Sequence, residues 1–149
     1  MGALTITVDD RQVKKTLTSL NKQLGNMQKP LDDAGSDLLQ YYGEEVFDTE
    51  GSALGVKWKP LSAATLKARR ERRGYYAQTP VATNKILTWT ARLRKGFKKK
   101  ATRDRLVVSN SVDYFKYHQL GGRRMLGVNK NVVVIVLKRL QDAINKSIV

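Results

Sequence analysis

The sequence has no cysteine and a single histidine, His118. The lack of cysteine excludes disulfides and thiolate metal sites, and a lone histidine argues against a zinc or non-haem iron site. No apolar run approaches the length of a membrane span, since the longest, Val132 to Leu137, has six residues. The N-terminus lacks the charged start, apolar block and cleavage site of a signal peptide. We therefore expect a protein without a membrane partner that acts where it is made.

Acidic residues are scarce: 13 Asp and Glu stand against 28 Lys and Arg, for a net charge of +15. Such an excess suggests nucleic acid, an anionic surface or an acidic protein as partner. The charges are also separated along the chain. Residues 31–56 contain seven acids and no Lys or Arg, whereas residues 57–105 contain sixteen Lys or Arg and two acids. The basic segments 67–73 and 92–105 are open to three interpretations: a solvated face, a DNA contact or a contact with an acidic partner.

Three stretches have the apolar spacing of amphipathic helices. The first runs from Val13 to Leu24. In the second, residues 31–46, the apolar side chains share one direction and the opposite side is almost purely acidic. Residues 131–137 have the β-branched composition of a strand, yet their apolar stripe continues with helical spacing toward the C-terminus. We predict a C-terminal helix over about 131–147.

Strands are expected at two places. Residues 4–8 alternate apolar and polar side chains. Residues 106–109 include β-branched residues, and this segment ends in residues that are typical of turns. The segment 87–97 has the spacing of a helix or helical turn and leads into three lysines. We expect the chain to return from there as a hairpin whose second strand is 106–109.

Two further segments complete the predicted architecture. Ser62 can cap a short basic helix over residues 63–73, and residues 75–85 lack periodicity, which indicates an exposed loop. At this length the chain suits one domain, 1–149. Together the elements predict an α+β fold in which a small antiparallel sheet packs with an N-terminal helix pair and a C-terminal helix.

The segment from Tyr114 to Gly122 combines aromatic residues, the histidine and a double glycine. A helical turn would place Tyr114 and Tyr117 on one side with Leu120 nearby, so we predict these three residues and His118 as core. His118 would be a packed, hydrogen-bonded residue. A role as general base is the alternative, but no Ser or Cys motif is placed to be activated by it.

Other catalytic patterns are also missing from the sequence. Glu44 and Glu45 are adjacent, so on a helix they point about 100° apart and do not form a glycosidase-like pair. Gly121-Gly122 lacks the strand–loop–helix context of a phosphate loop. We expect no enzyme activity, no catalytic residue, no cofactor and no metal.

Ordered blocks of the sequence resemble a known family. Residues 55–61, GVKWKPL, resemble a "G..W.pL" block, and residues 86–94, ILTWTARLR, resemble "iL..tGrLr". Residues 114–122, YFKYHQLGG, resemble "YA..HqfGg". These blocks are typical of phage virion morphogenesis proteins, the tail-completion and neck proteins of Mu-like and P2-like phages. The resemblance covers roughly residues 47–149. Ala91 departs from it, because the family has a glycine at this position, so the turn at residue 91 must tolerate a Cβ.

The resemblance implies a structural subunit that forms a ring at the head–tail junction. Such a protein would reside in the virion neck or tail top after assembly in the host cytoplasm. Its implied partners are copies of itself and neighbouring neck, tail-terminator or connector proteins, with DNA in the channel as a further candidate. The alternative is a free basic protein that binds nucleic acid without sequence specificity.

The candidate contacts to other subunits or DNA are two tryptophans and two charged faces. For the tryptophans, packing within the chain is favoured over an intersubunit anchor. For the charged faces, we hypothesise that the acidic helix of one copy meets the basic run of the next, since a closed ring needs two different faces. The candidates are Asp33, Asp37, Glu44, Trp58, Trp89, Arg92, Arg94, Lys98, Lys99, Lys100 and Arg103.

Overall fold

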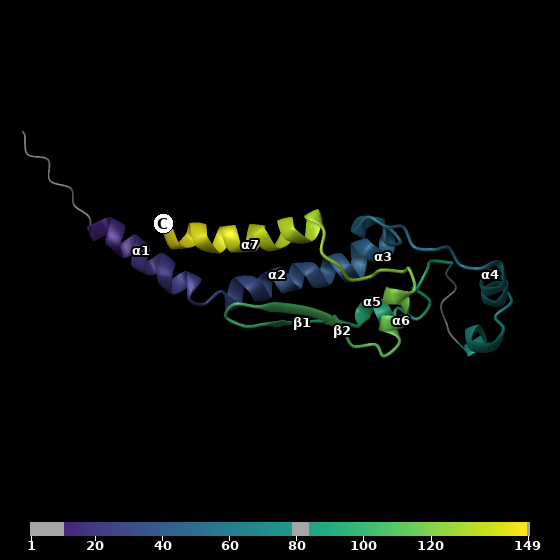
Figure 1. Ribbon diagram of the computed structural model, residues 1–149. Helices are drawn as coiled ribbons and strands as arrows, with labels where there is room; N and C mark the ends of the chain where they lie inside the picture. Colours follow the sequence, from purple (N-terminus) through teal and green to yellow (C-terminus); the bar gives the residue numbers. More distant parts are fainter. Residues whose placement is uncertain (1–10, 79–83, 149) are drawn as a thin grey trace, which may run out of the picture.

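The computed structural model describes residues 11–78 and 84–148, so the strand expected at residues 4–8 lies outside the described residues. The chain forms an elongated body (Figure 1). Helix α1 (Arg11–Leu24) lies at one end and α4 (Ala63–Arg70) at the other. The remaining elements lie between them along one axis.

Helix α2 (Gln28–Gln40) runs through the middle of this body. It continues through a π-helical segment, η1 (Tyr41–Glu45), into α3 (Val46–Asp48), which confirms the predicted amphipathic helix and extends it slightly. Its buried side carries the apolar residues whose spacing predicted it. These are Leu31, Ala34, Leu38, Tyr42 and Val46.

The sheet within the described residues is a two-stranded antiparallel hairpin. Strand β1 (Phe97–Ala101) pairs with β2 (Leu106–Asn110), as predicted, and the hairpin lies against α2 (Figure 1). The two elements approach closely at Gly35. A Cβ on Gly35 would lie 2.8 Å from Lys99 Cδ and 2.9 Å from Leu106 Cδ1. The glycine therefore lets the helix and the hairpin pack together.

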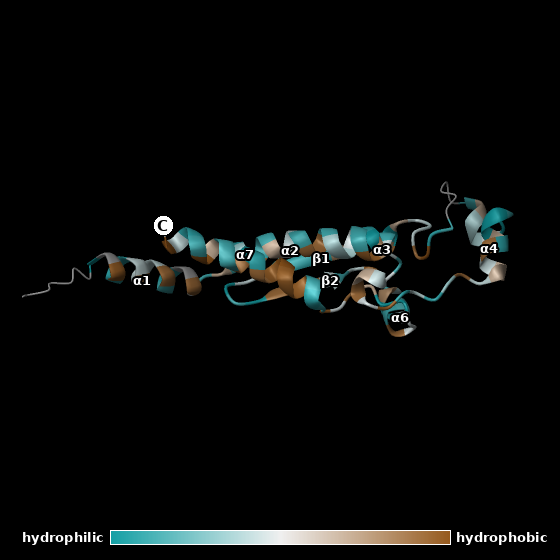
Figure 2. Ribbon diagram, turned by 90° about the horizontal axis from the view of Figure 1, so that it is seen from above, coloured by the Kyte–Doolittle hydropathy of each residue, from teal (hydrophilic) through white to brown (hydrophobic). Residues whose placement is uncertain are grey.

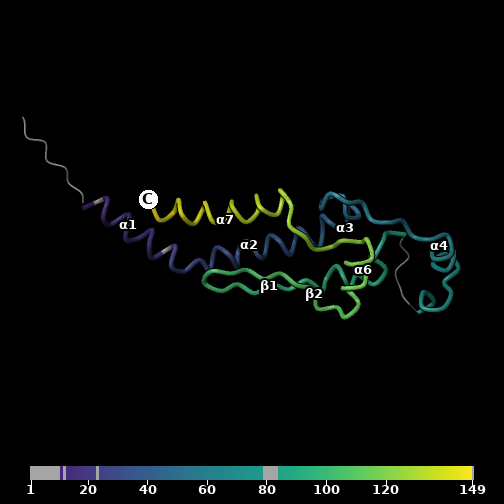
Figure 3. Tube along the Cα trace, viewed as in Figure 1, coloured from purple at the N-terminus to yellow at the C-terminus, as the bar shows by residue number. Residues whose placement is uncertain are grey.

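The C-terminal segment is helical, which settles the ambiguity between strand and helix. Helix α7 (Lys130–Ile148) runs antiparallel to α2 and brings the C-terminal end of the chain beside α1 (Figure 3). It packs against both α1 and α2. The α+β fold with N-terminal helices and a C-terminal helix is thus confirmed. None of the helices in the described part of the chain combines the length and apolarity that crossing a bilayer requires.

The segment 87–97 forms the shorter of the two structures that its spacing predicted, a helical turn. It contains only the short helix α5 (Arg92–Lys95), because Leu87 and Ala91 adopt left-handed conformations with φ of 56° and 57°. A residue with a Cβ is strained there, and the chain turns instead of continuing the helix. Beyond the hairpin, helix α6 (Phe115–Leu120) forms in the central aromatic segment, as expected.

Helix α4 begins as predicted but ends early. Ser62 caps it by accepting a hydrogen bond from the Thr65 amide at 3.1 Å. The helix stops at Arg70, before the predicted end at residue 73, because Arg72 has a left-handed φ of 50°. The expected exposed loop over 75–85 starts with a 3-10 turn, η3 (Gly74–Gln78). Residues 79–83 of that loop lie outside the described residues.

The core is centred on aromatic contacts where α3, the hairpin and the loop after α3 meet. The ring of Phe47 is fully buried and lies edge-on to Trp58, with 5.1 Å between centroids, and to Phe97, with 6.3 Å. Met125 is also fully buried and belongs to the same cluster. A second 3-10 turn, η2 (Ser52–Leu54), closes the loop over this cluster.

The core predicted around α6 is only partly right. Tyr114 and His118 are half-buried, but Tyr117 is 67% exposed and Leu120 is 86% exposed. The core prediction is therefore wrong for Tyr117 and Leu120. Helical spacing shows which residues share a side, but it does not show which side faces the core. In this helix Phe115 packs against the core instead.

Candidate functional site

Part of the acidic face predicted on α2 makes contacts with other residues of the same chain. Arg139 of α7 donates two hydrogen bonds to the Asp37 carboxylate, at 2.6 and 2.9 Å, and these bonds hold the pKa of Asp37 below its usual value. Asp33 lies 3.4 Å from the ammonium of Lys29, one helical turn away. Glu44 is exposed. Asp37 is thus a contact between α2 and α7, while Asp33 and Glu44 stay on the surface.

The basic run Lys98-Lys99-Lys100 is divided by the alternation of the strand. Lys99 faces α2, where its ammonium lies 2.8 Å from the Asp32 carboxylate and donates to the Ser36 hydroxyl at 2.7 Å. Lys98 and Lys100 occupy the alternate positions of β1 and are exposed. The three lysines therefore do not form one surface.

Two of the three arginines predicted with that run make contacts with other parts of the same chain. Arg94 pairs with a carboxylate of α3 at 3.0 Å, and Arg103 donates to the main-chain oxygen of Gly25 at 3.0 Å. Arg92 is exposed, with its guanidinium 5.9 Å from the centre of the Tyr114 ring. If the acidic face of one copy meets the basic run of the next, as predicted, this contact would have to use the charged residues that are not engaged within the chain.

Neither tryptophan is available as an anchor for another subunit. Trp58 is 2% exposed and Trp89 is 5% exposed. The ring of Trp58 belongs to the core, and Trp89 lies edge-on to Tyr76 with 5.0 Å between centroids. Their burial removes both from the candidate contacts and agrees with the packing role favoured from the sequence.

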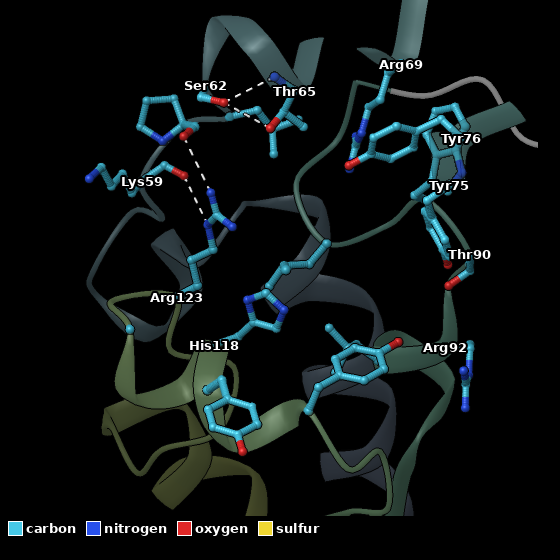
Figure 4. A pocket seen from close by; sticks show the side chains of 18 residues that line it. Lys59, Ser62, Thr65, Arg69, Tyr75, Tyr76, Thr90, Arg92, His118 and Arg123 are labelled. Carbon is cyan, nitrogen blue, oxygen red and sulfur yellow. Dashed lines mark hydrogen bonds between the residues drawn. The ribbon is translucent and has the colours of Figure 1, made fainter. Parts of the chain in front are cut away.

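A cleft of about 740 Å³ lies between the α4 end of the molecule and the rest of the body (Figure 4). Its lining comes from the segment around α4 and η3, from residues 87–93, and from α6 with the turn that follows it. Cationic and aromatic side chains dominate it, and none of the lining residues that the structure describes is Asp or Glu. The cations are Lys59, Arg69, Arg92 and Arg123, and the aromatic residues are Tyr75, Tyr76, Trp89, Tyr114, Tyr117 and His118.

Arg69 is the most deeply placed of these cations. It is 7% exposed, and its guanidinium lies 5.4 Å from the centre of the Tyr76 ring and 5.1 Å from that of Trp89. It also donates to the main-chain oxygen of Lys85 at 3.0 Å. Stacking on two aromatic rings fixes the guanidinium in the wall of the cleft.

A second arginine ties two walls of the cleft together. Arg123, in the turn after α6, donates through Nε to the main-chain oxygen of Lys59 at 3.3 Å. Figure 4 shows this contact beside the Ser62 cap of α4. The lead-in to α4 is therefore held against the turn after α6 by a contact between the two segments.

His118 faces this cleft from α6 (Figure 4). Burial, together with the neighbouring positive charge of Arg123, lowers the pKa of His118, so its imidazole is neutral at pH 7. No carboxylate lines the cleft to orient it, and the nearby Ser62 hydroxyl is engaged in capping α4. In the described part of the chain, no three His, Cys, Asp or Glu side chains gather in a way that would hold a metal ion. The arrangement is suited to binding an anionic group.

Sequence reasoning identified one cation of this cleft, Arg92, and missed the others. Arg69 was part of the basic segment 67–73 but was not distinguished from its neighbours. The sequence does carry one signal, since Tyr75 and Tyr76 follow that basic segment after a single glycine. Adjacent clusters of cations and aromatic residues would have been the pattern to examine.

Comparison with known proteins identifies the chain. The model of the phage virion morphogenesis family matches residues 8–139, which is most of the sequence. Neither the curated proteins nor the solved structures include a match. The matched range includes α1, α2, the hairpin, the cleft and more than half of α7. The chain therefore belongs to the phage virion morphogenesis family, which points to a structural and not a catalytic role in the virion.

Proposed function

We propose that this protein is a structural subunit of the phage head–tail junction that assembles with copies of itself into a ring. The ring would complete the tail or neck and join head to tail, with other neck, terminator or connector proteins as neighbours. Membership of the virion morphogenesis family supports a role in the particle. The observation that carries self-assembly is a pair of apolar surfaces, one convex and one concave, that a single chain leaves exposed.

The convex surface is the apolar stripe of α1. Val13, Leu17 and Leu24 are 57%, 59% and 56% exposed, although they fall on one side of the helix. The rest of α1 is polar and basic, with no acid in its sequence. A helix of this length is marginal in water, so burying its apolar stripe would stabilise it. Figure 2 shows apolar residues recurring along α1.

The concave surface is an apolar groove of about 590 Å³ between α2, β2 and α7. Its lining includes Leu38 of α2, Tyr42 of η1 and Val108 of β2. Along α7 it is bordered by Val133 and Leu137, which are 44% and 56% exposed. Figure 2 shows the apolar residues gathered in the first half of α7. A ring is built from a heterologous contact between two different faces, and the stripe and the groove are two such faces.

Charge-reversing changes on the two surfaces test this proposal. Leu17→Glu alters the stripe and Val133→Glu alters the groove, and either should convert the assembly to monomer in size-exclusion chromatography with light scattering. In a heterologous contact, a mixture of the two variants retains one intact interface per pair and should form a dimer. Leu120→Glu, at an 86% exposed position outside both surfaces, is the matched control and should assemble normally.

Electron microscopy of the wild-type assembly then shows whether it is a closed ring. A wild-type protein that is monomeric at all concentrations would contradict the proposal. So would variants of the stripe and the groove that assemble as well as Leu120→Glu. In that case another pair of surfaces, or another partner, would have to organise the subunit.

A second candidate is a basic protein that binds nucleic acid without sequence specificity. The net charge of +15 and the exposed lysines Lys98 and Lys100 on one face of β1 favour it. Such a protein would remain monomeric, and its affinity for duplex DNA would fall steeply with salt because binding releases counterions. Measurement of size and DNA affinity over a range of salt concentrations separates the two functions.

A further inference from the structure

The cleft beside α4 is lined by charged side chains of one sign. Four cationic side chains line it, Lys59, Arg69, Arg92 and Arg123, and no carboxylate balances them within the lining. A concave site with charges of one sign and low-dielectric walls concentrates the field of those charges. The potential in the cleft therefore favours an anionic occupant.

Three of the four cations, the arginines, are held in place before any partner arrives. Arg69 is stacked on Tyr76 and Trp89, Arg92 lies over the Tyr114 ring, and Arg123 is hydrogen-bonded to the main chain. Binding then requires little further ordering of these side chains, which lowers its entropic cost. Arg69 and Arg123 contribute positive charge while they donate to main-chain oxygens, whereas the exposed guanidinium of Arg92 matches the planar, two-oxygen geometry of a carboxylate.

The opening of the cleft adds exposed aromatic surface from two elements. Tyr75 of η3 is 63% exposed and Tyr117 of α6 is 67% exposed. Aromatic residues that are open in the free chain and become covered on binding are typical anchors of protein interfaces. The cleft thus offers apolar contact beside its charges.

We propose that this cleft binds a short extended peptide segment that carries carboxylate and apolar side chains and belongs to another protein of the particle. A volume of about 740 Å³ lies within the roughly 300–1,000 Å³ of sites that enclose small ligands. The assignment to a virion partner rests on the proposed function, whereas peptide binding itself is independent of ring formation. Failure of ring assembly with normal peptide binding would contradict only the proposed function. Normal ring assembly without peptide binding would contradict only the peptide proposal.

The same contacts argue against nucleic acid as the occupant. Single-stranded nucleic acid needs open aromatic faces on which bases stack. Cations lie over Tyr76, Trp89, Tyr114 and Tyr117. Among the described rings of the cleft, the exposed Tyr75 is the one that remains open to a base, whereas a bound strand stacks several bases. Duplex DNA presents a convex phosphate surface that would touch only the rim of the cleft.

Fluorescence anisotropy with three labelled probes tests the proposal on the full chain. The probes are a hexapeptide of alternating glutamate and leucine, its counterpart with glutamine in place of glutamate, and hexathymidylate. We expect the glutamate peptide to bind at least about tenfold more tightly than either of the other two. The glutamine peptide has no charge to pair with the cations, and hexathymidylate has phosphates but no apolar side chains to cover the exposed tyrosines. Tighter binding of hexathymidylate would assign the cleft to nucleic acid and overturn the proposal, as would equal binding of the two peptides.

Matched variants locate the binding. The double variant Lys59→Ala/Arg92→Ala removes two exposed cations that line the cleft, and Lys98→Ala/Lys100→Ala removes two exposed cations from β1 outside it. The first should weaken binding of the glutamate peptide by roughly tenfold, and the second by less than about threefold. Equal losses in the two variants would show that only the overall charge attracts the peptide, which overturns the site.

Two neutral variants and one spectroscopic signal complete the test. Tyr117→Ala removes an exposed ring from the cleft, whereas Leu120→Ala removes an exposed side chain from the same helix outside it. Binding should weaken about fivefold in Tyr117→Ala and remain unchanged in Leu120→Ala. The proton resonances of His118, the single histidine, should also titrate at higher pH when the glutamate peptide is bound. A His118 titration that is the same with and without saturating peptide would place the peptide elsewhere.

Discussion

The indole N–H of Trp58 donates a hydrogen bond to the main-chain oxygen of Arg124 over 2.7 Å. The two residues are 66 positions apart in the sequence. Residue 58 lies in the first block that resembles the family, and residue 124 lies two positions after the last one. The same indole ring packs edge-on against Phe47 in the core. One side chain thus holds the loop after α3, the turn after α6 and the core together.

Substitution of Trp58 should show these two contributions separately. Trp58→Phe keeps an aromatic ring but loses the hydrogen bond, and we expect the free energy of unfolding to fall by about 1–2 kcal/mol. Trp58→Ala also empties the core position and should cost about 3–5 kcal/mol. Urea denaturation followed by circular dichroism measures both. Equal losses in the two variants would mean that ring packing contributes little.

The spacing of apolar residues in the sequence predicted the amphipathic elements, which carry their apolar residues on one side. The spacing of residues 13–24, 31–46 and 131–147 follows the helical period, and α1, α2 and α7 form there. The hairpin followed from β-branched residues and turn chemistry in the same way. These signals are carried by neighbours in sequence, so no knowledge of the tertiary structure was needed.

The cleft could not be predicted by such reasoning because three distant segments form it. Tyr117 and Leu120 were expected in the core, yet the core forms around Phe47 and leaves their side of α6 exposed. Lys98, Lys99 and Lys100 were treated as one run, whereas strand alternation turns the middle lysine toward α2. Both errors came from not knowing which face of an element meets its neighbour.

Gly51 and Gly55 form a matched pair for testing a close contact. Both have φ of 88°, where a residue with a Cβ is strained by about 1–2 kcal/mol. A Cβ at Gly51 would also collide with the Trp58 ring, whereas a Cβ at Gly55 would meet nothing within 4 Å. Gly55→Ala should therefore lower the free energy of unfolding by about 1–2 kcal/mol, and Gly51→Ala by about 2–5 kcal/mol. Similar melting temperatures for the two variants would contradict the contact with Trp58.

Ala91 should be replaceable by glycine with a gain in stability. It adopts φ of 57° immediately before α5, at the position where the family resemblance expects glycine. Relief of the left-handed strain outweighs the greater entropy of glycine in the unfolded chain, so Ala91→Gly should stabilise the protein by about 0.5–1 kcal/mol. Ala68→Gly, inside α4, is the control and should destabilise it by about 1 kcal/mol. Thermal unfolding that shifts downward in both variants would show that the turn at residue 91 is different from the one described.

The contact between Asp37 and Arg139 should make the packing of α2 against α7 depend on pH. Hydrogen bonds from Arg139, reinforced by its charge, lower the pKa of Asp37 below the ordinary value of 3.8. The unfolded chain therefore takes up a proton at Asp37 before the folded chain does. The stabilisation is fully present above about pH 3.8 and is lost as the pH falls through the lower, folded-state pKa.

Asp37→Asn removes this linkage. The variant should be less stable than the wild type at pH 7, and the difference between them should shrink below about pH 3.8, where the wild-type carboxylate also becomes protonated. Glu44→Gln is the matched control, because Glu44 is exposed and accepts a hydrogen bond from Gln40 one helical turn away, so it is not expected to link α2 to α7. Urea denaturation at pH 7 and at about pH 3 measures the change for each variant. A difference for Asp37→Asn that is the same at both pH values would show that the charge on Asp37 does not contribute to the contact with α7.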